Sequence, residues 1–213
     1  FSRTLDCDPD EGIVNLTSFN DRYDFFLLKL NADGQFVWVK HFKGESYENA
    51  ISIDMDSNGN IYLAGYFYQN IDLDPGIDSS MFYSQGEDDA FICKLDSNGD
   101  LIWANSMGGD GDDNAGHLTL DSFGNFYISG SYDNSIDLDP GLNEFEIGGS
   151  VYSGYIAKYS QDGDFIWARN IASAPSAYIY DMKIDPQGNI MATGYFRGDR
   201  DFDPSDEEYV LNN

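Results

Sequence analysis

The feature that most constrains the fold is a repeat with a period of about 65 residues. The tryptophans Trp38, Trp103 and Trp167 fall at spacings of 65 and 64 residues. Lysines, glycines and Asp-Pro pairs keep the same period, at Lys29, Lys94 and Lys158, at Gly65, Gly130 and Gly194, and at Asp74-Pro75, Asp139-Pro140 and Asp203-Pro204. A fixed period of this length is typical of modular arrays, in which each unit buries its apolar face against a neighbour.

Aligning the chain on the tryptophans predicts four short strands in each unit. In the unit with the clearest pattern they cover residues 51–56, 61–67, 90–95 and 101–106, and turns of the Asn-Gly type follow the first and third strands. Glycine supplies the positive φ that such tight hairpins need, so Gly59 and Gly99 are expected to be structural. Four short strands in each repeat predict an all-β fold, a β-propeller of four-stranded antiparallel blades. A β-solenoid is the main competitor, although its coils are usually shorter.

The two ends of the chain stand at the same phase of the repeat. The segment 1–9 (FSRTLDCDP) matches 67–75 and again 196–204, so about three and a quarter repeats are present. We assign residues 1–213 to one partial propeller, with 1–20 ending a preceding repeat, 21–86 as repeat one, 87–150 as repeat two and 151–213 as an incomplete repeat three. Since closed propellers have four or more blades, we expect a piece of a longer polypeptide or a subunit completed by other chains.

Composition and charge narrow the possible partners. The chain is 41% apolar and 15% aromatic, which excludes a disordered polypeptide. Lys and Arg total 11 against 38 Asp and Glu, a formal net charge of -27. Such a surface repels phosphate and anionic lipid, and no apolar run reaches the roughly 20 residues of a membrane span, so we expect neither nucleic-acid binding nor membrane insertion. The acidity favours solubility and the binding of hard cations such as calcium.

The two cysteines are predicted to be small buried hydrophobic residues. Cys7 and Cys93 take positions that are apolar in the other repeats, so we expect no disulfide and no metal pair. The repeated tryptophans are expected to pack between neighbouring sheets. The repeated lysines are expected on a polar strand face, near carboxylates.

Two runs of sequence, DAFICKLDSNGDLIWANSMGG and LDSFGNFYISGSYDNSIDLDPG, resemble the bacterial β-propeller repeat family often called SBBP repeats. The shared pattern is an Asp-x-Phe-x-x-Lys strand, a D-x-x-G turn, a Trp strand and a D-x-x-G-N turn before a Ser-Gly or Thr-Gly strand. The resemblance implies a large secreted or cell-surface protein, frequently exported by the type IX route, with no established enzymatic activity. The third repeat departs at two acidic positions: Ser153 replaces Asp24 and Asp89, and Ala177 replaces Glu48 and Asp113.

The motif that most suggests chemistry is D-x-D-P, which occurs four times, as Asp6/Asp8, Asp72/Asp74, Asp137/Asp139 and Asp201/Asp203. In an extended strand the two carboxylates lie on one side, about 7 Å apart, and the apolar residue between them points into the core. Two like charges this close repel each other unless a counterion or hydrogen-bond donors offset them. We therefore expect these eight aspartates to bind Ca²⁺, with further oxygens from backbone carbonyls, waters or the loop 86–89. The alternative is a turn, because Asp before Pro-Gly accepts backbone amide hydrogen bonds.

Other acidic and histidine positions give weaker signals. Asp54-x-Asp56-x-Asn58-Gly59 imitates the start of an EF-hand but lacks its final Glu, so we expect a hairpin turn. The run 110–114 is expected to be a solvated loop. His41 and His117 are not repeated and form no zinc spacing. No nucleophile elbow or phosphate-binding loop is present, so we expect no catalytic residue and no enzyme activity.

The function predicted from these observations is a non-catalytic, extracellular scaffold or binding module, adhesin-like, secreted or at the cell surface, and stabilised by Ca²⁺. The variable stretches 77–86 and 142–151 are the expected surface for a glycan or an extracellular protein partner. Tyr68, Phe82, Tyr83 and Phe145 offer rings for sugar stacking, with burial in a blade as the alternative. The competing functions are a propeller-type carbohydrate-active enzyme, a structural assembly subunit, and a secretion cargo that engages the secretion machinery.

Overall fold

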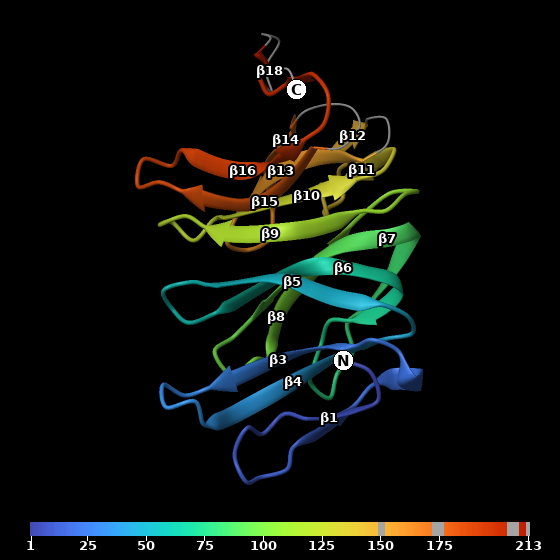
Figure 1. Cartoon of the computed structure of the whole chain (residues 1–213), viewed down its shortest axis with the longest axis vertical. Helices are drawn as coiled ribbons and strands as arrows, with labels where there is room; N and C mark the ends of the chain where they lie inside the picture. The colour runs from blue at the N-terminus through green and yellow to red at the C-terminus, as the bar shows by residue number, and fades with distance from the viewer. Residues whose placement is uncertain (149–151, 172–176, 204–208, 212–213) are drawn as a thin grey trace.

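The computed structural model describes residues 1–148, 152–171, 177–203 and 209–211. Its antiparallel sheets follow one another in sequence order, from the N-terminal strands at one end of the molecule to the C-terminal strands at the other (Figure 1). The described residues contain one single-turn 3-10 helix, η1 (Phe19–Asp21), and otherwise strands and turns. The chain is therefore all-β, as the sequence predicts.

Two four-stranded sheets form the centre of the molecule. The first sheet contains β5 (Glu48–Met55), β6 (Ile61–Asp72), β7 (Met81–Leu95) and β8 (Leu101–Met107), each paired antiparallel with the next. The second sheet contains β9 (Asn114–Leu120), β10 (Phe126–Tyr132), β13 (Ser153–Tyr159) and β14 (Phe165–Ile171), paired in the same way. A small hairpin, β11 (Ser135–Asp137) with β12 (Glu146–Gly148), extends from the second sheet.

A two-stranded pair lies on either side of these sheets. The N-terminal pair is β3 (Phe25–Leu30) with β4 (Phe36–Gly44), preceded by the hairpin of β1 (Thr4–Asp6) and β2 (Asn15–Thr17). The end of β4 also pairs with the end of β6, through Lys43 and Gly44. The C-terminal pair is β15 (Ala177–Ile184) with β16 (Ile190–Phe196), followed by β17 (Arg200–Asp201) with β18 (Val210–Leu211).

Three apolar clusters fill the contacts between successive layers, which we call seams. The largest cluster joins the first and second sheets and includes Tyr62, Phe126 and Tyr159. A second cluster joins the N-terminal pair to the first sheet, and a third joins the second sheet to the C-terminal pair. Each tryptophan packs against one of these clusters, which confirms the prediction that the indoles lie between sheets.

The tryptophan and lysine contacts repeat from one seam to the next. A Cβ atom at Gly99 would lie 3.1 Å from the Trp38 ring, and one at Gly163 would lie 3.5 Å from the Trp103 ring. At these two seams, therefore, the indole of one layer covers a turn glycine of the next layer, and both glycines have a positive φ. The lysines follow the same rule: Lys29 donates to the Ser97 carbonyl at 2.9 Å, and Lys94 donates to the Gln161 carbonyl at 3.1 Å.

Strands β6 and β7 are longer than the sequence predicts. The third strand of this unit begins at Met81 instead of residue 90, because β6 and β7 continue beyond an irregularity at Tyr68 and Asn70 as one long hairpin. Gln69 takes a positive φ at this point, and Asn134 does so at the equivalent place in the next unit, where the continuation forms the separate hairpin β11–β12. The same left-handed position recurs at Arg3 and Gly198.

The arrangement is consistent with a β-propeller: four-stranded antiparallel sheets, one per repeat, packed face to face in chain order. Within the described ranges the layers do not close into a ring (Figure 1). The first sheet takes its strands from residues 48–107 and so crosses the predicted boundary at 86/87. The repeat boundaries proposed from the sequence stay a prediction.

Candidate functional site

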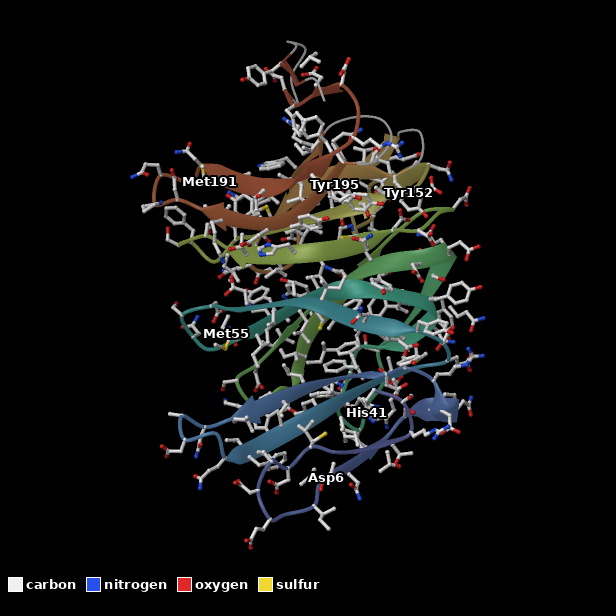
Figure 2. All side chains as sticks on the ribbon, in the orientation of Figure 1. Asp6, His41, Met55, Tyr152, Met191 and Tyr195 are labelled. Carbon is white, nitrogen blue, oxygen red and sulfur yellow. The ribbon has the colours of Figure 1, made fainter. Side chains whose placement is uncertain are left out.

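The four D-x-D-P segments form one type of turn. The Asp72 Oδ1 atom accepts hydrogen bonds from the amides of Asp74, at 3.1 Å, and Ser80, at 2.8 Å. The Asp74 Oδ1 atom then accepts from the Gly76 amide at 2.7 Å. Asp6 and Asp137 each close the same eight-residue loop by accepting two amide hydrogen bonds. Asp201 accepts hydrogen bonds from the amides of Asp203 and Tyr209, and Asp8 and Asp139 each accept one from the amide two residues ahead. Figure 2 shows Asp6 in the loop at the N-terminal end of the molecule.

Three of these turns place the residue between the aspartates in the core, as predicted, and Phe202 in the fourth is partly buried. Cys7, Leu73 and Leu138 are all buried, and Cys93 is buried in the first sheet. Both cysteines are free thiols, which confirms that they act as small buried hydrophobic residues.

The D-x-D-P carboxylates supply few of the oxygens that calcium needs. Calcium takes six to eight oxygen ligands, whereas each loop offers two carboxylates whose Oδ1 atoms already accept amide hydrogen bonds, as at Asp72 and Asp74. In the described part of the chain, no three Asp, Glu, His or Cys side chains come together as a metal site. The turn role is therefore established by geometry, and calcium binding stays a prediction.

The EF-hand-like segment is also a turn. The Asp56 Oδ1 atom accepts the amides of Asn58 and Asn60, each at 2.9 Å, and its Oδ2 atom accepts the Asn60 side-chain amide at 2.7 Å. Lys94 lies 3.9 Å from the same carboxylate, and Lys158 lies 3.5 Å from Asp121 in the next unit. Lys94 and Lys158 are thus near carboxylates, as the sequence predicts, whereas Lys29 donates to the Ser97 carbonyl.

A pair of carboxylates is buried in the seam between the two four-stranded sheets. Asp89 on β7 and Asp113, just before β9, are almost fully buried, although the sequence predicts a solvated loop for the run 110–114 that contains Asp113. That expectation is wrong because the segment before β9 folds into the seam. Burial raises the pKa of Asp89 to about 7, and burial together with the charge of Asp89 raises the pKa of Asp113 to about 8.

The hydrogen bonding of this pair is incomplete. The Asp89 Oδ2 atom accepts the Gln85 amide at 3.2 Å, whereas its Oδ1 atom has no partner. The amides of Gly109 and Asp133 approach Asp113 and partly offset the rise in its pKa, but no contact to either Asp113 oxygen meets hydrogen-bond geometry. A buried carboxyl that lacks hydrogen-bond donors is more stable in its protonated form than in its ionised form near neutral pH.

The neighbouring seam holds an equivalent pair, Asp24 and Glu48. Both are buried, and burial raises the pKa of Glu48 to about 7. His41 Nε2 lies 2.5 Å from Asp24 Oδ2, and Figure 2 shows His41 between the N-terminal strands. At the third seam the same positions hold Ser153 and Ala177, which are buried and uncharged. The sequence showed these positions to be periodic, but only the fold shows that they face each other across a seam.

The variable loops present apolar residues to solvent. Ile77 and Leu142 stand at equivalent positions, directly after the Pro-Gly of two D-x-D-P turns, and both are fully exposed. Tyr83 is also exposed, whereas Phe82 and Phe145 pack against the clusters of their seams. Much of the stretch 77–86 belongs to strand β7, and the stretch 142–151 ends outside the described residues. Burial in the blade, the alternative role for these rings, is therefore the correct one for Phe82 and Phe145.

Comparison with known proteins finds a weak similarity to a repeat protein. No protein-family model matches it. It is 22% identical, over 214 residues, to an uncharacterised WD repeat-containing protein of Acanthamoeba polyphaga mimivirus. The match covers 89% of this chain and 15% of the relative, so the chain spans less than a sixth of that protein's length. The described residues contain no helix long and apolar enough to cross a membrane.

Proposed function

We propose that this chain is a non-catalytic β-propeller module that serves as a scaffold and binds another protein through its D-x-D-P loops. Similarity to a WD repeat-containing protein supports the architecture, because WD repeats build propeller blades of four strands. Membership of the bacterial SBBP repeat family is a narrower part of the proposal and is supported by the sequence resemblance.

The accessibility of the acidic pairs argues against catalysis. A glycoside hydrolase needs one carboxylate pair that the substrate can reach. Here the carboxylates with strongly raised pKa values, Glu48, Asp89 and Asp113, are buried in two seams, where they repeat one arrangement. Duplication and burial favour a role in the architecture.

We infer the binding function from one observation, the exposed apolar residue at the tip of each of two successive loops. Ile77 and Leu142 occupy the same phase of the repeat and contribute nothing to the described core. Glu11 takes this position in the first loop, so the turn itself does not require an apolar residue. Exposed apolar side chains within an acidic surface suit a partner with an apolar groove and a basic rim.

Affinity capture with two matched variants tests this function. We expect Ile77→Asp with Leu142→Asp to lose the partners that the wild-type protein captures from native cells. The control is Phe123→Asp, since Phe123 is also largely exposed but lies in the β9–β10 turn. Loss of the same partners from the control, or release of reducing ends from glycans by the wild-type protein, would contradict the proposal.

Calcium stabilisation and a secreted or cell-surface location complete the proposal. Both depend on the acidic D-x-D-P loops and on the sequence resemblance. Thermal unfolding with calcium and with a chelator tests the first: the expected result is a higher midpoint in calcium. If calcium raised the unfolding midpoint equally in the double variant Asp72→Asn with Asp74→Asn, calcium would bind outside this loop.

A further inference from the structure

A tyrosine-lined pocket spans three successive layers of the array. Tyr66, on β6 of the first sheet, and Tyr178, on β15 of the C-terminal pair, line a cavity of about 240 Å³. The second sheet contributes Asn114 and Ser131 to the same cavity. Tyr152, just before β13, adds a third tyrosine (Figure 2). Within the described ranges no lining residue belongs to a D-x-D-P turn, so this pocket is separate from the loops of the proposed function.

The pocket exists because the middle layer has small side chains where its neighbours have rings. At this level each layer pairs two residues across adjacent strands: Asn49 with Tyr66, Asn114 with Ser131, and Tyr178 with Tyr195. The Asn114 side-chain amide donates to the Ser131 Oγ atom at 2.7 Å, so these two side chains form a polar part of the lining. Since Ser131 takes the place that a tyrosine holds in both flanking layers, the volume of that ring is left open.

Three carboxyl groups line the same pocket. Asp88 lies on β7, and Asp112 and Asp113 precede β9. The Asp113 amide donates to the Asp88 carbonyl at 2.7 Å, which joins the two segments. Burial raises the pKa of Asp88 and of Asp113, and in both cases the charge of Asp112 raises it further. Among the residues that the structure describes, the lining includes no lysine or arginine, so it contains no cation to offset these carboxyl groups.

Two of these carboxyl groups depart from the repeat. Asp88 and Asp112 take the positions that Tyr23 and Tyr47 hold in the preceding unit, where the two rings stack with their centroids 6.0 Å apart. The architecture of a seam therefore accepts uncharged rings at these positions. Carboxyl groups here are a property of this seam and are not required by the fold.

The third carboxyl group lacks hydrogen-bond partners. Asp113 is fully buried, and neither of its oxygens has a donor. A buried polar group without a partner is costly, so a ligand that brings N–H donors to this carboxyl would be stabilised by it. A positive charge on the ligand would also reduce the repulsion among the three groups and favour the ionised form of Asp113.

We propose that this pocket binds the guanidinium group of an arginine side chain presented by a partner polypeptide. Guanidinium is planar, has several N–H donors in fixed directions and stacks on aromatic rings, which suits carboxyl groups beside tyrosines. A quaternary ammonium has no N–H donor for Asp113, and the ammonium of lysine has no plane to stack on a ring. The cavity of about 240 Å³ suits one side chain, since pockets for whole ligands measure about 300 to 1,000 Å³.

NMR titration of the intact chain with a Gly-Arg-Gly peptide, acetylated and amidated at its ends, tests this proposal. The arginine peptide is expected to shift the amide signals of Asp112, Asn114 and Tyr178 in a saturable way. The matched control has citrulline in place of arginine, because citrulline keeps the size and the plane but has no charge. It is expected to bind about ten-fold more weakly or less, and a lysine peptide about three-fold more weakly or less.

Two substitutions test whether the peptide binds in the pocket. Asp112→Asn removes one charge but keeps an acceptor for the Tyr152 hydroxyl, which lies 3.1 Å from Asp112 Oδ2, and should weaken binding about ten-fold. Tyr178→Leu removes one ring and should weaken binding about three- to ten-fold. The controls are Asp110→Asn, in the same loop, and Tyr180→Leu, on the same strand, since neither residue lines the pocket.

Both control variants should bind the arginine peptide as the wild-type protein does. An arginine peptide that does not saturate, equal affinities for the arginine and citrulline peptides, or a lysine peptide that binds as tightly as the arginine peptide would each overturn the proposal. Equal losses of affinity in Asp110→Asn and Asp112→Asn would also overturn it, because the peptide would then respond only to the net negative charge of the protein.

Discussion

Replacing Asp113 with Asn should change how stability depends on pH. The folded protein holds this carboxyl protonated, because burial and the neighbouring Asp89 raise its pKa to about 8, whereas the unfolded chain ionises it near 4. Between these values the folded state binds more protons than the unfolded state, so the free energy of unfolding falls as pH rises. The expected slope from this one group is about 1.4 kcal/mol per pH unit, or about 3 kcal/mol between pH 5 and 7.

Urea denaturation of the wild-type protein and the Asp113→Asn variant from pH 5 to 8 measures this slope. Asn has the size of Asp but does not titrate, so the variant's free energy of unfolding should not fall with pH by the amount that Asp113 contributes. The variant should therefore be more stable than the wild-type protein at pH 8. Asp110→Asn is the control, because Asp110 is exposed in the same loop, and it should keep the wild-type slope. Equal slopes for Asp113→Asn and the wild-type protein, or wild-type stability that rises from pH 5 to 8, would refute the reasoning.

Three further substitutions test the repeat architecture, each by the midpoint of chemical denaturation. Trp103→Ala should cost about 3 to 5 kcal/mol, because it empties the seam between the two four-stranded sheets, and a loss below 1 kcal/mol would contradict the packing. Gln69→Gly should stabilise the protein by about 0.5 to 1 kcal/mol by relieving a positive φ, and a destabilised variant would contradict this. Gly65→Ala should destabilise by more than 1 kcal/mol, because its Cβ would overlap the Asn49 carbonyl oxygen, whereas Gly34→Ala meets no atom within 4 Å and reports only the φ penalty.

The sequence predicts the order and pairing of the layers because these depend on local patterns that repeat. The Asn-Gly turns, the alternation of apolar residues and the spacing of Trp38, Trp103 and Trp167 are all visible in the chain. The turns at the D-x-D-P segments are predictable for the same reason, since an aspartate and the amides it accepts lie within eight residues.

Features that depend on contacts between units are not predictable from one unit's pattern. The extent of β7 depends on its pairing with β6 beyond the left-handed residue Gln69, whose side chain gives no signal of that conformation. The burial of Asp113 requires the whole seam, because an acidic residue in an acidic loop carries the same local pattern whether it faces water or a neighbouring sheet.

The lysine contacts give the array a direction. At two junctions one layer donates from a strand lysine to a turn carbonyl of the next, as Lys29 does toward Ser97 and Lys94 toward Gln161. Such a head-to-tail interface is heterologous, so its two surfaces differ and each fits only the opposite one. A copy of one layer would therefore have to stack on another in the same orientation, lysine side against turn side, to repeat this contact.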